Sequence, residues 1–84
     1  MFDGKTFTSE MKKITKNIVD YYDAEEAWEA YDNANIAIQA AYYQGLIDKK
    51  TMQEAIAEFT MAAITIELRE KDEQNLYGYT YRPL

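Results

Sequence analysis

The chain lacks both cysteine and histidine, and these two absences exclude most catalytic and metal-binding chemistry. Without cysteine there is no disulfide, no zinc finger and no thiolate nucleophile. Without histidine there is no imidazole to act as an acid, a base or a metal ligand near neutral pH. We therefore expect a non-enzymatic protein with no metal, no cofactor and no small-molecule substrate.

Basic residues are also scarce, with 9 lysines and arginines against 15 aspartates and glutamates and a net charge of −6. Nucleic-acid binders need clustered cations to displace counterions from phosphates, and anionic membranes attract cations in the same way. No apolar run approaches the ~20 residues of a membrane span, and the N-terminus has no signal-peptide pattern. We expect a cytoplasmic protein that binds neither nucleic acid nor membrane.

Helix breakers are few in the 84 residues, which include three glycines and one proline. None lies between Thr8 and Gln44, or between Leu46 and Asn75. These two uninterrupted stretches, joined at Gly45, predict an all-α fold.

A single small domain with three helices is the predicted architecture. The helices are expected at about residues 9–22, 24–44 and 49–73, within a domain over 1–84 whose ends, 1–8 and 75–84, are extended or flexible. Alternating tyrosines at positions 77, 79 and 81 predict a short extended tail. This tail is expected to fold back over the third helix or to bind a partner.

The predicted boundaries rest on residues that satisfy the free backbone groups at helix ends. Asp23 and Glu26 have the spacing of a capping box, so the second helix is expected to begin at Ala24. Gly45 is expected to end it, because glycine readily adopts the left-handed conformation that follows many helices. The remaining candidate caps are Thr8 or Ser9 for the first helix and Asp48 or Thr51 for the third.

An apolar rhythm of three to four residues also continues across Asp23, from Ile14 to Tyr42. It leaves open a single helix over residues 9–44, which would form a long hairpin with the third helix and dimerise into a bundle. We favour a break between Tyr22 and Asp23.

Each predicted helix has an apolar face for the core. The faces comprise Met11, Ile14, Ile18 and Tyr21 or Tyr22 in the first helix, Ala27, Tyr31, Ala34, Ile38 and Ala41 or Tyr42 in the second, and Met52, Ile56, Phe59, Ala63 and Ile66 in the third. The third helix has a second apolar row on its opposite side, here called the outer stripe: Ala57, Met61, Ile64 and Leu68. We expect this stripe to pair with a second copy, giving a homodimer, or to bind another chain.

Residues 20–32 contain six acidic residues, no basic residue and four large aromatic residues. A helical projection gathers part of this segment and its continuation into one surface, here called the acidic–aromatic face: Glu25, Trp28, Glu29, Asp32, Ile36 and Tyr43, with Trp28 at the margin. Carboxylates speed encounter with a basic surface, and aromatic groups supply contact area. The face predicts binding to another protein with a basic surface; the alternative is a solubilising surface with Trp28 in the core.

Small inhibitors from phages and mobile elements, anti-CRISPR and anti-restriction proteins among them, are similar to this chain in size, acidity and lack of catalytic groups. An acidic row on a rigid helix can occupy the groove that another protein uses for phosphates. The leading hypothesis is therefore an inhibitor or adaptor that binds a protein. A structural homodimer is the second, and the third, which we do not favour, is a helix-turn-helix nucleic-acid binder that uses a set of lysines: Lys12, Lys13, Lys16, Lys49 and Lys50.

Overall fold

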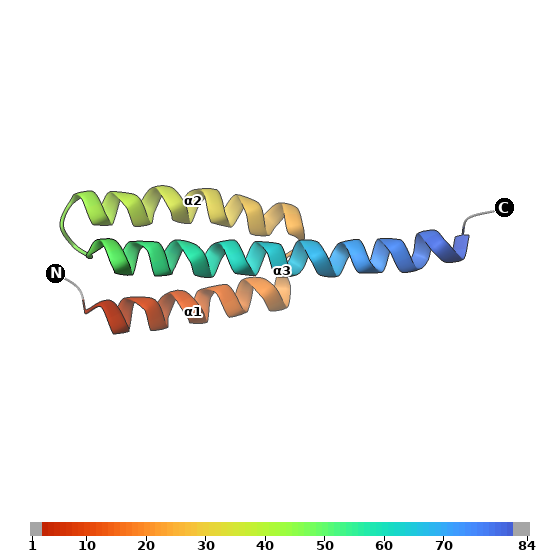
Figure 1. Ribbon diagram of the computed structural model, residues 1–84, viewed down its shortest axis with the longest axis horizontal. Coiled ribbons are helices and arrows are strands. Elements are labelled where there is room, and N and C mark those ends of the chain that lie inside the picture. Colours follow the sequence, from red (N-terminus) through yellow and green to blue (C-terminus); the bar gives the residue numbers. More distant parts are fainter. Residues whose placement is uncertain (1–2, 82–84) are drawn as a thin grey trace.

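Over the residues that the structure describes, the protein is an all-α bundle of three helices, as predicted, in an up-down-up arrangement (Figure 1). The computed structural model describes the backbone of residues 3–81 and the side chains through Glu73. The helices are α1 (Gly4–Tyr21), α2 (Ala24–Tyr43) and α3 (Lys49–Tyr81). Two separate helices therefore occupy the stretch for which a single helix over residues 9–44 was the alternative, and the predicted break is confirmed.

Local capping explains where α2 begins and ends. The Asp23 carboxylate accepts a hydrogen bond from the Glu26 amide at 2.8 Å, and the Glu26 carboxylate accepts one from the Asp23 amide at 3.2 Å. This is the predicted capping box. Gly45 follows the helix with a φ of 77°, the left-handed conformation predicted for it.

The start of α1 differs from the prediction, because the helix begins at Gly4 rather than near Ser9. Asp3 is the actual cap, and its carboxylate accepts hydrogen bonds from the Lys5 amide at 3.1 Å and the Thr6 hydroxyl at 3.2 Å. A Cβ at Gly4 would lie 2.7 Å from the Thr51 hydroxyl oxygen, so the glycine allows α1 and α3 to approach closely. Residues 4–8 are thus helical, which corrects the expectation of an extended end.

The end of α3 also differs, because the helix continues through residues 74–81 instead of stopping at 71–73. The predicted extended tail and its fold-back over the outer stripe are therefore wrong for this segment. Adding residues to an existing helix avoids the cost of nucleation, and the single Gly78 costs only about 1 kcal/mol. The added turns project beyond α1 and α2, which explains the long dimension of 60 Å against 18 and 17 Å (Figure 1).

The core forms where α3 packs against both other helices. Its buried residues are Ile18, Ala27, Ile38, Ile47, Ala55, Phe59, Ala62, Ala63 and Ile66. The prediction named most of these, but it missed Ala55 and Ala62, which lie at the centre of the buried face of α3. Ile14 and Tyr21 were predicted in the core and are 45% and 79% exposed, because α1 turns that side away from α3.

The cap of α3 is Asp48, one of the two candidates, and it makes the stability of the protein depend on pH. Hydrogen bonds from the hydroxyl and the amide of Thr51 hold the pKa of the Asp48 carboxyl below its usual value. A carboxyl with a lowered folded-state pKa stabilises the fold above its unfolded pKa, and this contribution is lost as pH falls through the folded value.

We therefore expect Asp48→Asn to lower the urea midpoint near pH 7, and to lower it less at about pH 2, because a larger share of the wild-type carboxyl is protonated as the pH falls. Urea unfolding followed by circular dichroism measures both differences. Asp20→Asn is the control, because Asp20 is exposed and caps no helix. An equal difference at both pH values would contradict the assignment of Asp48 as the charged cap.

Candidate functional site

The acidic–aromatic face lies on the side of α2 that points away from the core. Glu25, Glu29 and Asp32 are all exposed. The two large apolar members beside them are among the most exposed in the described part of the chain, at 71% for Ile36 and 79% for Tyr43. The structure thus brings five of the six predicted residues onto one solvent-facing surface.

Trp28, the sixth, belongs instead to the contact between α2 and α3. Its indole Nε1 donates a hydrogen bond to the Glu67 carboxylate at 3.2 Å. Its ring meets that of Tyr31 edge-to-face, with centroids 5.5 Å apart. The side chain is half-buried and packs against the core, so it anchors the face at its margin rather than projecting from it.

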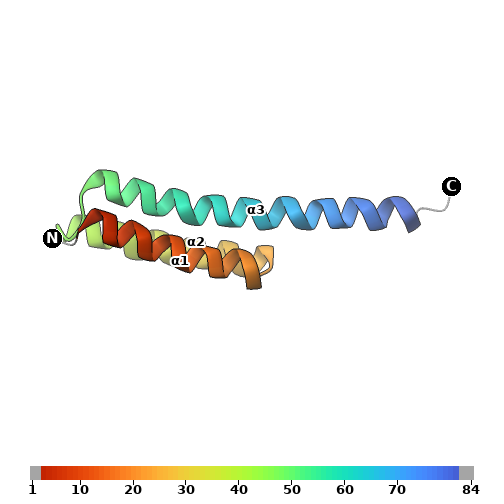
Figure 2. The same ribbon diagram turned by 90° about the horizontal axis from the view of Figure 1, so that it is seen from below.

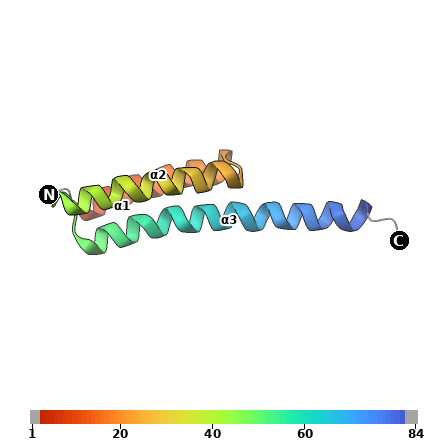
Figure 3. The same cartoon turned by 90° about the horizontal axis from the view of Figure 1, so that it is seen from above.

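The outer stripe of α3 is exposed along its whole length. Met61 is 61% exposed, Leu68 is 56% exposed and Ile64 is 37% exposed, and Ala57 is also exposed. Figures 2 and 3 show the reason, since α1 and α2 both lie on one side of α3 and leave its other side bare.

A groove between α1 and α2 is a third surface, and it was not predicted from the sequence. Its lining is entirely apolar and encloses about 300 Å³, with contributions from all three helices: Phe7, Met11, Ile14, Ala34, Ala37, Ile38, Ala41 and Phe59. The expected start of α1 at Ser9 had placed Phe7 outside any helix. The only sequence signal of the groove was the alanine spacing in α2, and that spacing does not distinguish a groove from close helix packing.

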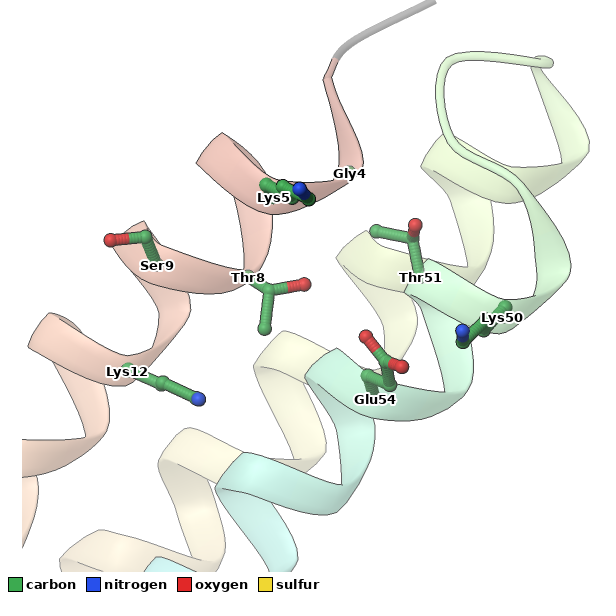
Figure 4. Close-up of a pocket in the computed structure, with 8 residues that line it drawn as sticks. All are labelled: Gly4, Lys5, Thr8, Ser9, Lys12, Lys50, Thr51 and Glu54. Carbon is green, nitrogen blue, oxygen red and sulfur yellow. The ribbon is translucent and has the colours of Figure 1, made fainter.

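A pocket of about 430 Å³ lies between the first turns of α1 and α3 (Figure 4). It brings Lys5, Lys12 and Lys50 together with the Glu54 carboxylate. Of the five lysines in the nucleic-acid hypothesis, only Lys12 and Lys50 line this pocket, while Lys13 pairs with Glu10 at 3.3 Å on α1.

The pocket has little capacity for an anion. First-turn amides of both helices already donate hydrogen bonds to carboxylates, to Asp3 in α1 and to Asp48 in α3, so these amides are not free to bind an anion. The Thr8 hydroxyl oxygen lining the pocket is buried without a hydrogen-bond partner, so a ligand does not reach it without a shift of the helices.

Within the described residues, no group of three or more acidic side chains is close enough to hold a metal ion. The described helices include none that combines the length and apolarity needed to cross a membrane. Comparisons with protein families, curated proteins and solved structures found no match to the chain. The arguments about function therefore rest on the surfaces described above.

Proposed function

We propose that this chain is a non-enzymatic, acidic protein-binding protein whose acidic–aromatic face docks on a basic surface of another protein. The observation that carries the proposal is the joint exposure of Ile36, Tyr43 and three carboxylates on one rigid helix. Large apolar groups left in water beside charges of one sign are typical of a contact surface, because they gain free energy only when a partner covers them.

The charges of the face support the choice of a basic partner. The segment from Ala24 to Gln44 contains no lysine or arginine, and the whole chain has a net charge of −6. Such a field accelerates encounter with cationic surfaces and repels anionic ones. An inhibitor or adaptor of a nucleic-acid-binding protein, acting in the cytoplasm as phage and mobile-element inhibitors do, is the most specific form of the proposal.

Reversing the charge of the face tests this proposal. The triple variant Glu25→Lys, Glu29→Lys, Asp32→Lys is expected to lower capture of basic partners from a cell lysate at least about tenfold, because each lost attraction becomes a repulsion. Captured proteins are identified by mass spectrometry, and circular dichroism verifies that helicity is unchanged.

The matched control makes the same change in net charge elsewhere, with Asp20→Lys, Asp72→Lys and Glu73→Lys, all at exposed positions. This control is expected to retain the partners. If both triple variants lose them equally, net charge rather than the acidic–aromatic face drives binding, and the proposal fails.

A homodimer through the outer stripe is the second candidate function. It is favoured by the exposure of Met61 and Leu68, whose spacing with Ile64 alternates three and four residues as in a two-helix seam. Light scattering on a sizing column at two protein concentrations tests it, since a dimer doubles the molar mass.

A further inference from the structure

The groove between α1 and α2 has the form of a docking site for a helix. Large side chains of α1 form one wall, alanines of α2 form the other, and Phe59 of α3 lies between them. Because Phe59 is 6% exposed and belongs to the core, it is the floor of the groove, and the open side faces away from α3. Three helices packed in this way leave the fourth position of a four-helix bundle empty.

Exposure along the groove shows that its walls lack a cover. Ile14 on the α1 wall is 45% exposed, and Ala37 on the α2 wall is exposed as well. The apolar wall from Phe7 to Ile14 is about 10 Å long, so it matches an amphipathic helix with apolar residues at i, i+3, i+4 and i+7.

The charged groups beside the groove select the kind of helix. Asp3 and Glu10 lie around Phe7 at one end. One ammonium group, that of Lys13, pairs with Glu10 and offsets part of this charge. This end of the groove, here called the acidic rim, thus has two carboxylates against one ammonium group.

We infer that this groove binds a basic amphipathic helix of a partner protein, with its apolar side against Phe59 and its lysines or arginines at the acidic rim. A second copy of this chain, docking through its outer stripe on α3, is the other occupant that the test distinguishes.

Two synthetic helical peptides test this inference with the full chain. Both have leucines at i, i+3, i+4 and i+7, and their flanking positions are lysine in one peptide and glutamate in the other. We expect the lysine peptide to bind at least about tenfold more tightly than the glutamate peptide. In spectra of the isotope-labelled protein, its binding is expected to shift the amide signals of Phe7, Ile14 and Ala37.

Two alanines of α2 provide matched variants. Ala37 and Ala40 are both exposed, but only Ala37 lines the groove. Ala37→Lys fills the groove and adds a like charge, and it is expected to weaken the lysine peptide at least about tenfold, while Ala40→Lys leaves its affinity within about twofold. Equal affinities of these two variants, or equal affinities of the two peptides, would overturn the inference.

The test also separates the groove from the acidic–aromatic face, on which the inference does not depend. The Glu25, Glu29, Asp32 reversal is expected to leave amide shifts around the groove in place. If that variant alone removes peptide binding, the peptide uses the acidic–aromatic face and the groove inference fails while the proposed function stands. The molar mass of the protein alone tests the other occupant. If the wild type is a dimer and Ala37→Lys is a monomer, a second copy occupies the groove, and this result contradicts the basic partner inferred here.

Discussion

Ile66→Ala is expected to lower the free energy of unfolding by about 3–4 kcal/mol. Ile66 is fully buried at 0% exposure, within the core that joins all three helices. Truncating it removes apolar contacts and leaves a cavity that the surrounding side chains fill only in part. An 84-residue domain has on the order of 8 kcal/mol of stability, so this one change removes a large share of it.

Ile64 is a matched control, because it is the same residue type two positions away on the same helix. It is 37% exposed on the outer stripe, and Ile64→Ala is expected to cost less than about 1 kcal/mol. Urea unfolding followed by circular dichroism measures both. Equal losses would show that the outer stripe is as buried in solution as the core, and would favour the homodimer.

Ala63→Leu is expected to destabilise the bundle by about 2–3 kcal/mol, although leucine is apolar and favours helices. Ala63 has 0% exposure on the buried face of α3, next to Ala62 at 4%. Small side chains at this contact bring α3 close to its neighbours, and a larger one forces the helices apart or into strained rotamers.

Ala57→Leu is the corresponding change on the exposed side of α3, where the added side chain meets solvent. It is expected to alter the unfolding free energy by less than about 0.5 kcal/mol. Thermal unfolding of the two variants measures the contrast. A similar cost at both positions would contradict the assignment of one side of α3 to the core and the other to solvent.

The two boundaries of α2 depend on short sequence signals and were predicted well. The capping box of Asp23 and Glu26 and the left-handed Gly45 each involve groups within a few residues of one another. The start of α1 was missed because Asp3 offers the same capping chemistry as Thr8 and Ser9, and nothing local decides between them. The end of α3 was missed because the alternating tyrosines have the spacing of a strand, whereas no strong helix breaker precedes Tyr81.

The candidate sites divide in a similar way. Helical periodicity placed Glu25, Glu29, Asp32, Ile36 and Tyr43 on one side of α2, and the structure exposes all of them. Trp28 lies at the edge of that arc, where a small rotation of α2 decides whether it meets solvent or α3. Its hydrogen bond to Glu67 spans 39 positions of the chain, so no local sequence pattern predicts it.

The sequence by itself determined that the protein is helical, acidic and without histidine or cysteine chemistry, because composition and three-to-four-residue spacing act within one helix. Only the tertiary structure decided which exposed apolar surfaces exist. Packing α1 and α2 on the same side of α3 buried Ala55 and Ala62, exposed the outer stripe, and opened the groove over Phe59. A groove is a property of the distance between helices, and that distance is set by how side chains from all three of them fit together.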